Sequence, residues 1–429
     1  MCHFFRSVLS TAALVFLLLS FPRPNHDLRR NSNNESSKTS AVAMENNNGG
    51  AKGSTIFEDL STLEDIWRLL KDLVPNRGTR GYVPPGGAIV ADFELVVRDM
   101  MVAGTHPERG DTGGHRSAHA RTCDEIDLRG LNGKYRIGTF VDGDTKRSYC
   151  VLATTSISYP WGTVVVDLDA ATTKNLSFDC PHPRFDAETG EQGIRLLKGT
   201  TAGSWIVAGS HRMANNDSPG TCQPEHSYRP SDAAHSDDNC FLAAVAAVKF
   251  YYESVVRQDY TSVQLHGMGT KSCGSVDTFF SHGSCRDGPA SKPEKIDVLS
   301  EIASAQPLDD GLHASANSDG SGCRLCASTN VQGRLINGVP RSELCERPAS
   351  SHNGRFVHIE QKREYRRERK ARFWNDVFGE AYPRFLDLAG NTPVPATERH
   401  ATGGGGGEEN HNDCLEAVPW IPIGFHSDL

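Results

Sequence analysis

The sequence predicts an α/β fold, in which a single large domain holds a mixed, mostly parallel sheet flanked by helices, between disordered ends. Three observations predict it. Short apolar runs rich in β-branched residues recur along the middle of the chain, and an Ala-rich helical stretch stands between two of them. The chain also has 429 residues, of which 37% are hydrophobic and 23% charged, enough apolar material for a sizeable core.

The N-terminal segment resembles a targeting sequence. An apolar run over residues 8–21 follows Arg6 and has the length of a signal-peptide core, which is short for a membrane-spanning helix. No small-x-small cleavage site follows, so an uncleaved signal anchor is the alternative. We expect a signal peptide or signal anchor at 1–22, a disordered linker rich in Asn, Ser, Lys and Gly at 23–55, and a protein of the secretory pathway, extracellular or lumen-facing.

The main domain is expected over residues 56–400. Its first element is an amphipathic helix over 56–74, where apolar residues recur at helical spacing. Residues 135–141 and 147–153 flank an Asp-Gly-Asp turn and predict a β-hairpin. Further strands are predicted at 163–168, 204–208, 262–265 and 356–359.

The segment 240–256 predicts a buried helix, because it is apolar on nearly every face, with Asp237 or Asp238 as its cap. A low-complexity Gly-rich segment at 401–413 and a C-terminal tail at 414–429 end the chain.

The chain has 12 cysteines, and 11 remain when Cys2 in the targeting segment is set aside. In an oxidising compartment most of these would pair and one would be left over. We read Cys323 and Cys326 as disulfide-forming, with a zinc knuckle as the alternative. Sequons at Asn34 and Asn175 are compatible with a glycoprotein.

The charge balance limits the partners. A net charge of −8 and a pI of about 6.1 argue against a nucleic-acid partner, and the mean hydropathy of −0.45 excludes a multispan membrane protein. The basic run over 362–372 is interpreted as a solvated face; the alternative is that it attracts an acidic substrate or an anionic surface.

Polar side chains cluster where predicted strands end, which is where α/β sheets bind ligands. His182 leaves one strand and is followed by the acids Asp186, Glu188 and Glu191, while His266 ends a second strand and Glu360 a third. Two histidines and one carboxylate with an open fourth position form a usual catalytic zinc site. Glu360 would then be a separate general base for the attacking water. Taken singly, each histidine is more often a structural residue.

Three further residues are candidates for binding the substrate. Arg212 offers a planar fork for a carboxylate and Asn215 offers polar handles, both just after the strand at 204–208. Arg334 could clamp an anion from a later polar loop. The alternative for both arginines is a solvated loop side chain. The stretch 228–235 is interpreted as a turn held by Asp232 rather than a substrate loop.

The order of these motifs resembles the N-formylglutamate amidohydrolase group, which is related in fold to zinc carboxypeptidases and aspartoacylase-like deacylases. The similar segments are Pro181-His182, 211–215 (HRMAN), Leu265-His266-Gly267, 330–333 (NVQG) and 358–365 (HIEQKREY). They span about 180 to 375. The resemblance implies a carboxypeptidase-like fold and zinc-dependent hydrolysis of an amide bond in a small molecule or peptide that bears a carboxylate.

The sequence departs from that pattern at two places. The spacing His-x-x-Glu is absent, because Phe185 stands three residues after His182, and the family's asparagine–arginine order is not reproduced. The third ligand is therefore Asp186, Glu188 or Glu191. We favour Glu191, because Thr189 can cap a helix that begins near Gly190 and brings Glu191 into its first turn, with Asp186 next.

The functional prediction is a secreted or membrane-anchored zinc-dependent amidohydrolase or deacylase. Its zinc ion would be held by His182, by Glu191 or Asp186, and by His266, with Glu360 as the general base. The alternative is a non-catalytic, disulfide-stapled extracellular binding protein on the same scaffold. A serine hydrolase is disfavoured because the sequence has no Gly-x-Ser-x-Gly elbow.

Overall fold

The computed structural model describes residue 57 and residues 59–103, 122–169, 173–285, 293–306, 312–316 and 321–382, all within the compact unit Gly50–Leu429. The predicted targeting segment (1–22), linker (23–55), Gly-rich segment (401–413) and tail (414–429) lie outside the described residues, as does the end of the domain predicted over 56–400.

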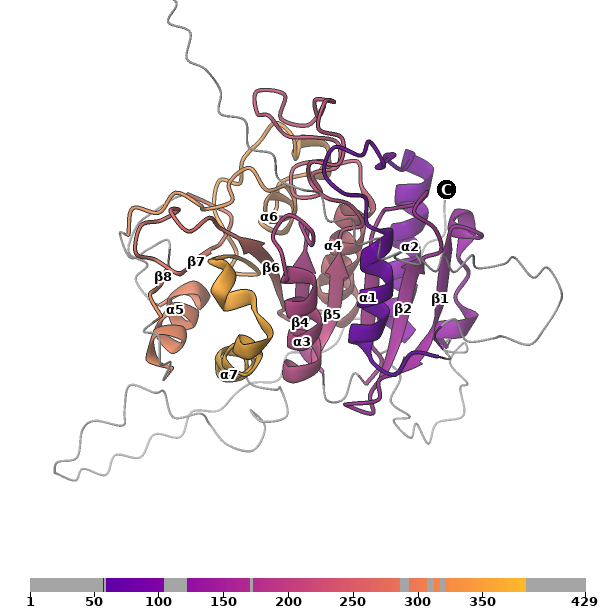
Figure 1. Cartoon of the computed structure of the whole chain (residues 1–429), viewed down its shortest axis with the longest axis horizontal. Coiled ribbons are helices and arrows are strands. Elements are labelled where there is room, and N and C mark those ends of the chain that lie inside the picture. The colour runs from indigo at the N-terminus through magenta and orange to yellow at the C-terminus, as the bar shows by residue number, and fades with distance from the viewer. Residues whose placement is uncertain are drawn as a thin grey trace, which may run out of the picture. The chain divides into compact units, whose positions relative to one another are not determined.

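The centre of the unit is one mixed sheet of nine strands in the described residues, in the order β1-β2-β3-β5-β4-β6-β9-β7-β8 (Figure 1). Four of its eight pairings are parallel (β5–β4, β4–β6, β6–β9 and β7–β8) and four are antiparallel. The strands are β1 (Tyr135–Val141), β2 (Ser148–Thr154), β3 (Thr163–Asp167), β4 (Lys174–Cys180), β5 (Ala202–Val207), β6 (Thr261–Gly267), β7 (Thr278–Ser281), β8 (Ala314–Ala316) and β9 (Phe356–Gln361).

Helices cover both faces of this sheet. Those that pack in front of it in Figure 1 are α1 (Leu63–Leu73), α3 (Thr189–Thr200), α5 (Lys295–Ala305) and α7 (Ala371–Ala381). Those behind it are α2 (Gly87–Ala103), α4 (Cys240–Phe250) and α6 (Val331–Ile336). Two large apolar cores result, one on each face, as expected for a sheet that is buried on both sides.

The fold class is confirmed, since a mixed sheet flanked by helices is what the alternating pattern predicts. The expectation of a mostly parallel sheet is wrong: the β1–β2 hairpin continues antiparallel into β3 and β5. The hairpin and the other predicted strands are present at the predicted places, within a few residues.

The helix boundaries differ from the prediction for local reasons. The first helix begins at Leu63 rather than at residue 56, because Thr62 and Asp65 form a capping box there. The buried helix starts after Asn239, whose side chain accepts from the Leu242 N–H, and not after Asp237 or Asp238. It ends as an α-helix at Phe250 and continues as a π-helical turn over Tyr251–Val256.

Four disulfides link described cysteines: Cys123–Cys150, Cys222–Cys345, Cys273–Cys323 and Cys285–Cys326. The two cysteines of the CxxC motif therefore do form disulfides, each with a different partner, and are not available to a zinc knuckle. Four disulfides indicate an oxidising, extracellular environment. Among the described helices, none is both long and apolar enough to cross a bilayer.

Three neighbouring parallel strands place the candidate site. β4, β6 and β9 run side by side in the same direction, so their carboxyl ends meet at one edge of the sheet. His182 follows β4, His266 is the penultimate residue of β6, and Glu360 of β9 pairs in register with His266. Residues far apart in the sequence are thereby brought together at the position where α/β sheets bind ligands.

The carboxyl end of β4 carries a buried carboxyl group that makes the stability of the fold depend on pH. Asp179 is fully buried and accepts hydrogen bonds from Ser177 Oγ at 2.7 Å and from Ser262 Oγ. Burial outweighs these bonds and raises the pKa of Asp179 to about 6, against 3.8 for a free side chain. The folded state therefore binds this proton more tightly than the unfolded state.

We predict that Asp179→Asn stabilises the protein at pH 8. Because the pKa of Asp179 is higher in the folded than in the unfolded state, its bound proton stabilises the folded state fully below pH about 4. This contribution to the free energy of unfolding is lost as the pH rises through about 6. The amide removes that loss, worth up to about 3 kcal/mol, and the melting temperature at pH 8 should rise by several degrees. The gain should vanish near pH 4. A difference in melting temperature that does not change with pH would contradict this.

Asp259→Asn is a control of opposite sign. Burial disfavours the charged form of Asp259, but hydrogen bonds from Lys295 and Arg355 outweigh it and lower its pKa. That variant should slightly lower the melting temperature at pH 8 and have less effect in acid.

Candidate metal centre

Two histidines and one aspartate converge at the carboxyl ends of β4 and β6. The Nδ1 atoms of His182 and His266 each lie 3.2 Å from the same oxygen, Oδ2 of Asp186, and the two rings are 4.9 Å apart between centroids. All three residues are buried. The turn after β4 produces this arrangement, because the Asp186 N–H donates to the His182 carbonyl at 2.8 Å and brings the carboxylate back toward the ring.

The other nitrogen of each ring is held by a second residue. Nε2 of His182 lies 2.8 Å from Oδ1 of Asp232, and Nε2 of His266 lies 2.8 Å from Oε1 of Gln264. The Gln264 oxygen also accepts from Asn330, and its amide nitrogen donates to Gln332 at 3.2 Å, which fixes the orientation of the amide. Both Nε2 atoms are therefore the protonated ones, since carboxylate and amide oxygens only accept.

When the rings are neutral, the lone pairs of both Nδ1 atoms therefore face the Asp186 carboxylate. Three acceptors then point at one place, which is unfavourable unless a cation or a proton lies between them. Two imidazoles and one carboxylate are a donor set that suits zinc, and a carboxylate on the remote nitrogen of a ligating histidine is a usual second-shell feature. His182, Asp186 and His266 thus fit a zinc ion.

The electrostatics of the three residues agree with a site for a cation. Burial disfavours the charged form of Asp186, but its close contacts with His182 and His266 outweigh burial and lower its pKa. Burial lowers the pKa of His266 to about 4, so this ring is neutral at pH 7. Burial and Arg212 also oppose a charge on His182, but Asp232 and Asp186 outweigh them and raise its pKa.

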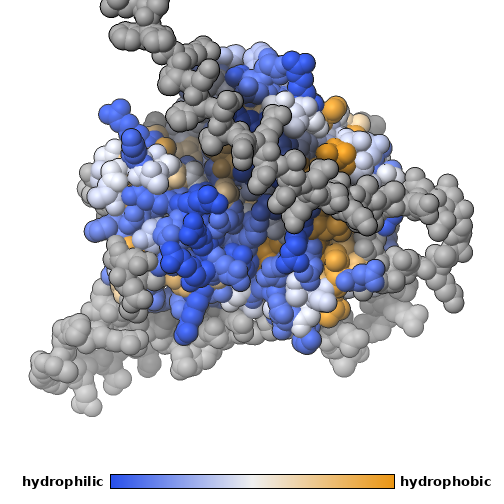
Figure 2. Space-filling view, viewed as in Figure 1, coloured by the Kyte–Doolittle hydropathy of each residue, from blue (hydrophilic) through white to orange (hydrophobic). Residues whose placement is uncertain are grey.

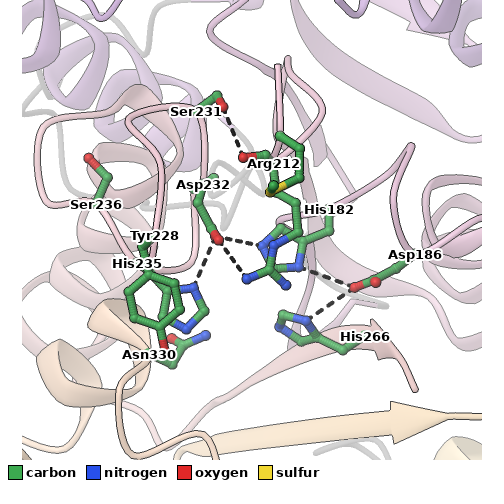
Figure 3. Close-up of polar contacts among 12 residues, drawn as sticks. His182, Asp186, Arg212, Tyr228, Ser231, Asp232, His235, Ser236, His266 and Asn330 are labelled. Carbon is green, nitrogen blue, oxygen red and sulfur yellow. Dashed lines mark hydrogen bonds and ion pairs between the residues drawn. The ribbon is translucent and has the colours of Figure 1, made fainter. Parts of the chain in front are cut away.

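Asp232 connects the centre to the loop that precedes α4. Its carboxylate is bound by Nε2 of His182, by Nδ1 of His235 at 3.0 Å and by Nη2 of Arg212 at 2.6 Å (Figure 3). The His235 ring is stacked on Tyr228 with centroids 3.7 Å apart. Burial disfavours an ionised Asp232, yet His235 and His182 outweigh it and hold the pKa well below its ordinary value. Asp232 therefore does more than stabilise a turn, which is all that the sequence predicted.

Glu360 is adjacent to this centre. A carboxylate oxygen of Glu360, a nitrogen of His266 and a nitrogen of His358 lie within 4.8 Å of one another, and the side chain of Glu360 keeps 14% exposure. Burial and the nearby charge of Asp186 raise the pKa of Glu360 to about 8, against the opposing effect of Arg212 and Arg366. A carboxyl group with a raised pKa beside a candidate metal site is suited to exchanging protons.

The two other acids proposed as ligands point elsewhere. Helix α3 begins at Thr189, and Glu191 in its first turn faces α1, where its carboxylate pairs with Lys71. Glu188 pairs with Arg363 at 3.2 Å. The structure therefore brings Asp186, and not the favoured Glu191, to the two histidines, because the turn after His182 closes four residues on.

The residues proposed to bind substrate are placed differently from one another. Arg212 lies at the centre but binds Asp232, and Nδ2 of Asn215 donates to the Tyr82 carbonyl at 2.8 Å. Arg334 is buried and donates to the carbonyl oxygens of Ser328 at 2.9 Å and Leu344 at 2.6 Å. Arg334 therefore stabilises its own loop through Nε and Nη1, and its binding of an anion stays a prediction. Substrate contacts by Arg212 and Asn215 stay predictions.

Sequence reasoning missed Arg366, which lies in the basic run over 362–372. The exposed arginines of this run contribute to the hydrophilic surface over α7 in Figure 2, as predicted for a solvated face. Arg366 instead turns inward and is only 5% exposed. Its guanidinium lies so close to Gly267 that a Cβ there would be 1.5 Å from Nη1. No described residue accepts a hydrogen bond from its Nε or Nη1.

Comparison with protein-family models and with curated proteins gave no match. Three solved structures are similar to part of the chain. The first is a gene product of Agrobacterium tumefaciens, with a TM-score of 0.32 and 13% identity over 49% of this chain and 90% of that chain. The second is a succinylglutamate desuccinylase from Vibrio parahaemolyticus, with a TM-score of 0.30 and 10% identity over 58% of this chain and 76% of that chain. The third is a metallo-carboxypeptidase from Burkholderia cenocepacia, with a TM-score of 0.26 and 9% identity over the same shares of the two chains. All three TM-scores are below 0.5, so the geometry of the site is the basis for inferring a function.

The assignment of Asp186 is testable with a matched pair of acid-to-amide variants. We predict that Asp186→Asn lowers the zinc affinity by about 100-fold or more, because an amide loses the negative charge of the ligand. Glu191→Gln, five residues away, should bind zinc as the wild type does. Zinc affinity is measured by competition with a chromogenic chelator. Equal affinities for the two variants, or a loss confined to Glu191→Gln, would contradict the assignment.

Proposed function

We propose that the protein is a secreted zinc-dependent hydrolase that cleaves an amide bond in a substrate bearing a carboxylate. The observation that carries this proposal is the convergence of His182 Nδ1, His266 Nδ1 and Asp186 on one point, with the Glu360 carboxyl group beside it. The motif resemblance to N-formylglutamate amidohydrolases supports the same reaction class. Secretion is supported by the four disulfides and by the apolar run over 8–21, which lies outside the described residues.

The metal would supply Lewis-acid chemistry: a zinc ion held by His182, Asp186 and His266 would polarise the amide carbonyl and lower the pKa of a water molecule. The chain's own contribution begins with keeping those three side chains fixed. Asp232 and Gln264 do this, because each holds the remote nitrogen of one ring. Burial of the whole set excludes competing water and strengthens every charge interaction within it.

Glu360 would move the proton. Its carboxylate takes a proton from the attacking water and returns it to the nitrogen of the leaving amine, so that one carboxyl group serves as base and then as acid. The raised pKa of Glu360 suits the second step, because a carboxyl group with a pKa near 8 gives up its proton less readily to bulk water than to an amine. Its position in register with His266 keeps it beside the ligand set.

Arg366 would bind the carboxylate of the substrate. It is a buried cation whose Nε and Nη1 have no acceptor among the described residues, and it lies against Gly267, directly after the ligand His266. Burial lowers the pKa of Arg366 against the opposing effect of Asp186, Glu188 and Glu360. An arginine side chain nevertheless stays charged at pH 7. A buried guanidinium of this kind gains most from a planar anion that accepts two hydrogen bonds.

We predict that Glu360→Gln keeps the zinc but lowers kcat by about 10²–10⁴-fold, because the amide cannot exchange the proton. N-acyl amino acids and short peptides are the substrates to screen, with release of the free amine as the readout. Glu364→Gln, four residues later and paired with Arg369, is the control and should keep full activity. Full activity of Glu360→Gln would show that the general base is another group. Tight zinc binding without turnover of any N-acyl amino acid or peptide would favour the non-catalytic binding protein.

Two substrates, one with and one without a carboxylate, distinguish substrate binding by Arg366 from a purely structural role. We predict that Arg366→Met raises KM for an N-acyl amino acid by about 10–100-fold, since a charge-assisted hydrogen-bond pair is lost. The matching carboxamide substrate, which lacks the anion, should be cleaved by wild type and variant with similar kcat/KM. An equal loss for both substrates would mean that Arg366 only supports the fold.

A further inference from the structure

A second group of metal-type side chains lies away from the candidate centre. It consists of His282, Glu294 and His352, whose ligand atoms lie within 4.8 Å of one another. His282 follows β7, Glu294 is the residue before α5, and His352 precedes β9. Because β7 runs antiparallel to β9, this group sits near Phe356 at the start of β9, whereas Glu360 near its end belongs to the first centre. Four residues of strand separate them by about 13 Å.

The buried histidine of this group has the hydrogen bonding of a metal ligand. Nδ1 of His282 lies 2.7 Å from the carbonyl oxygen of Phe356, which only accepts, so the proton is on Nδ1 and the lone pair on Nε2. A backbone carbonyl on the remote nitrogen is a common way to orient a metal-binding histidine. His282 is 2% exposed, and its Nε2 has no hydrogen-bond partner among the described residues.

The distances from Glu294 to each histidine fit a common ion, and the two histidine rings are stacked with their centroids 4.5 Å apart. Nε2 of His282 lies 3.7 Å from Oε2 of Glu294, too long for a hydrogen bond, and Nε2 of His352 lies 3.2 Å from Oε1 of Glu294. Two ligands about 2.1 Å from a tetrahedral zinc ion are about 3.4 Å apart, so these separations are close to those of a ligand set. The neighbouring cation Lys295 is turned away and binds Asp259 at 3.0 Å.

The backbone that carries the two histidines is tied together by asparagine side chains. Nδ2 of Asn337 donates to the carbonyl of His282 at 2.7 Å, while its Oδ1 accepts from the N–H of Asn353 at 3.2 Å. Nδ2 of Asn353 in turn donates to the Ile336 carbonyl at 2.6 Å. The end of α6 therefore fixes the segment after β7 relative to the segment before β9, which reduces the entropy that an ion would have to overcome on binding.

We propose that His282, Glu294 and His352 form a second zinc site, distinct from the hydrolytic centre, that clips β7, α5 and the segment before β9 together. The side chains of Glu294 and His352 are each 27% exposed, so an ion can enter from solvent and a water molecule can complete the coordination. No general base is needed, and the role of the site is structural. The inference does not depend on the proposed hydrolase activity.

The test is the zinc content of the full chain, stripped with a chelator, reloaded with Zn²⁺ and analysed by elemental mass spectrometry. We expect two zinc ions per wild-type chain and one in His352→Ala, whose partly exposed side chain can be removed without opening the core. His282→Gln, which keeps a buried polar side chain of similar size, should also hold one. His313→Ala, the change of an exposed histidine outside the cluster, should hold two.

A further variant, His182→Ala/His266→Ala, separates the two sites. It should keep one zinc ion, and zinc should raise its melting temperature by about 5 °C at a hundredfold excess over Kd, a rise that is lost when His352→Ala is added. If the hydrolytic centre holds no zinc, the wild type should have one ion and His352→Ala none. If His352→Ala and His282→Gln hold as much zinc as the wild type, the second site is refuted whatever the other centre does.

Discussion

The candidate centre depends on one buried carboxylate, that of Asp232. By accepting from His182 Nε2 it fixes the tautomer of that ring, and only in this tautomer does the Nδ1 lone pair face Asp186 and the space shared with His266. The same carboxylate is paired with the Arg212 guanidinium and accepts a hydrogen bond from His235, so its charge is not left unpaired in the interior. The uncharged Gln264 side chain orients His266 in the same way, and it is itself held by hydrogen bonds with Asn330 and Gln332. The two ligand rings are therefore oriented before any ion arrives, which is the condition for a rigid metal site.

The sheet supplies the second constraint. Parallel pairing of β4, β6 and β9 puts the two histidines and Glu360 at one edge, and antiparallel β7 carries His282 toward the opposite end of β9. Strand β9 thus borders both proposed zinc sites, the hydrolytic centre at its carboxyl end and the structural site at its beginning. Gly267 shows how tightly the first edge is packed, because any side chain there would collide with the Arg366 guanidinium. The Arg366 guanidinium, whose Nε and Nη1 have no acceptor among the described residues, is the reason for proposing a substrate that bears a carboxylate.

The fold class and the strand ends followed from local patterns, and His182, His266 and Glu360 were recognisable because each ends an apolar run. What could not be predicted is which groups meet across long sequence distances. Asp186 and Glu191 are both acids within ten residues of His182, and only the closed turn at 182–186 distinguishes them. Asp232 looked like a turn residue because its partner His182 is 50 residues away. Arg366 lies within a run of mostly exposed basic residues, so the sequence does not distinguish it from its neighbours. Nor does the sequence indicate that two loop carbonyls accept hydrogen bonds from Arg334.

The central claim is that the buried set formed by His182, Asp186 and His266 holds a zinc ion. Crystals of the zinc-loaded full chain, measured on both sides of the zinc absorption edge, test it directly. The predicted result is an anomalous peak within about 2.0–2.2 Å of Nδ1 of His182, Nδ1 of His266 and an oxygen of Asp186. Density that shows these three side chains in place with no anomalous peak between them would contradict it.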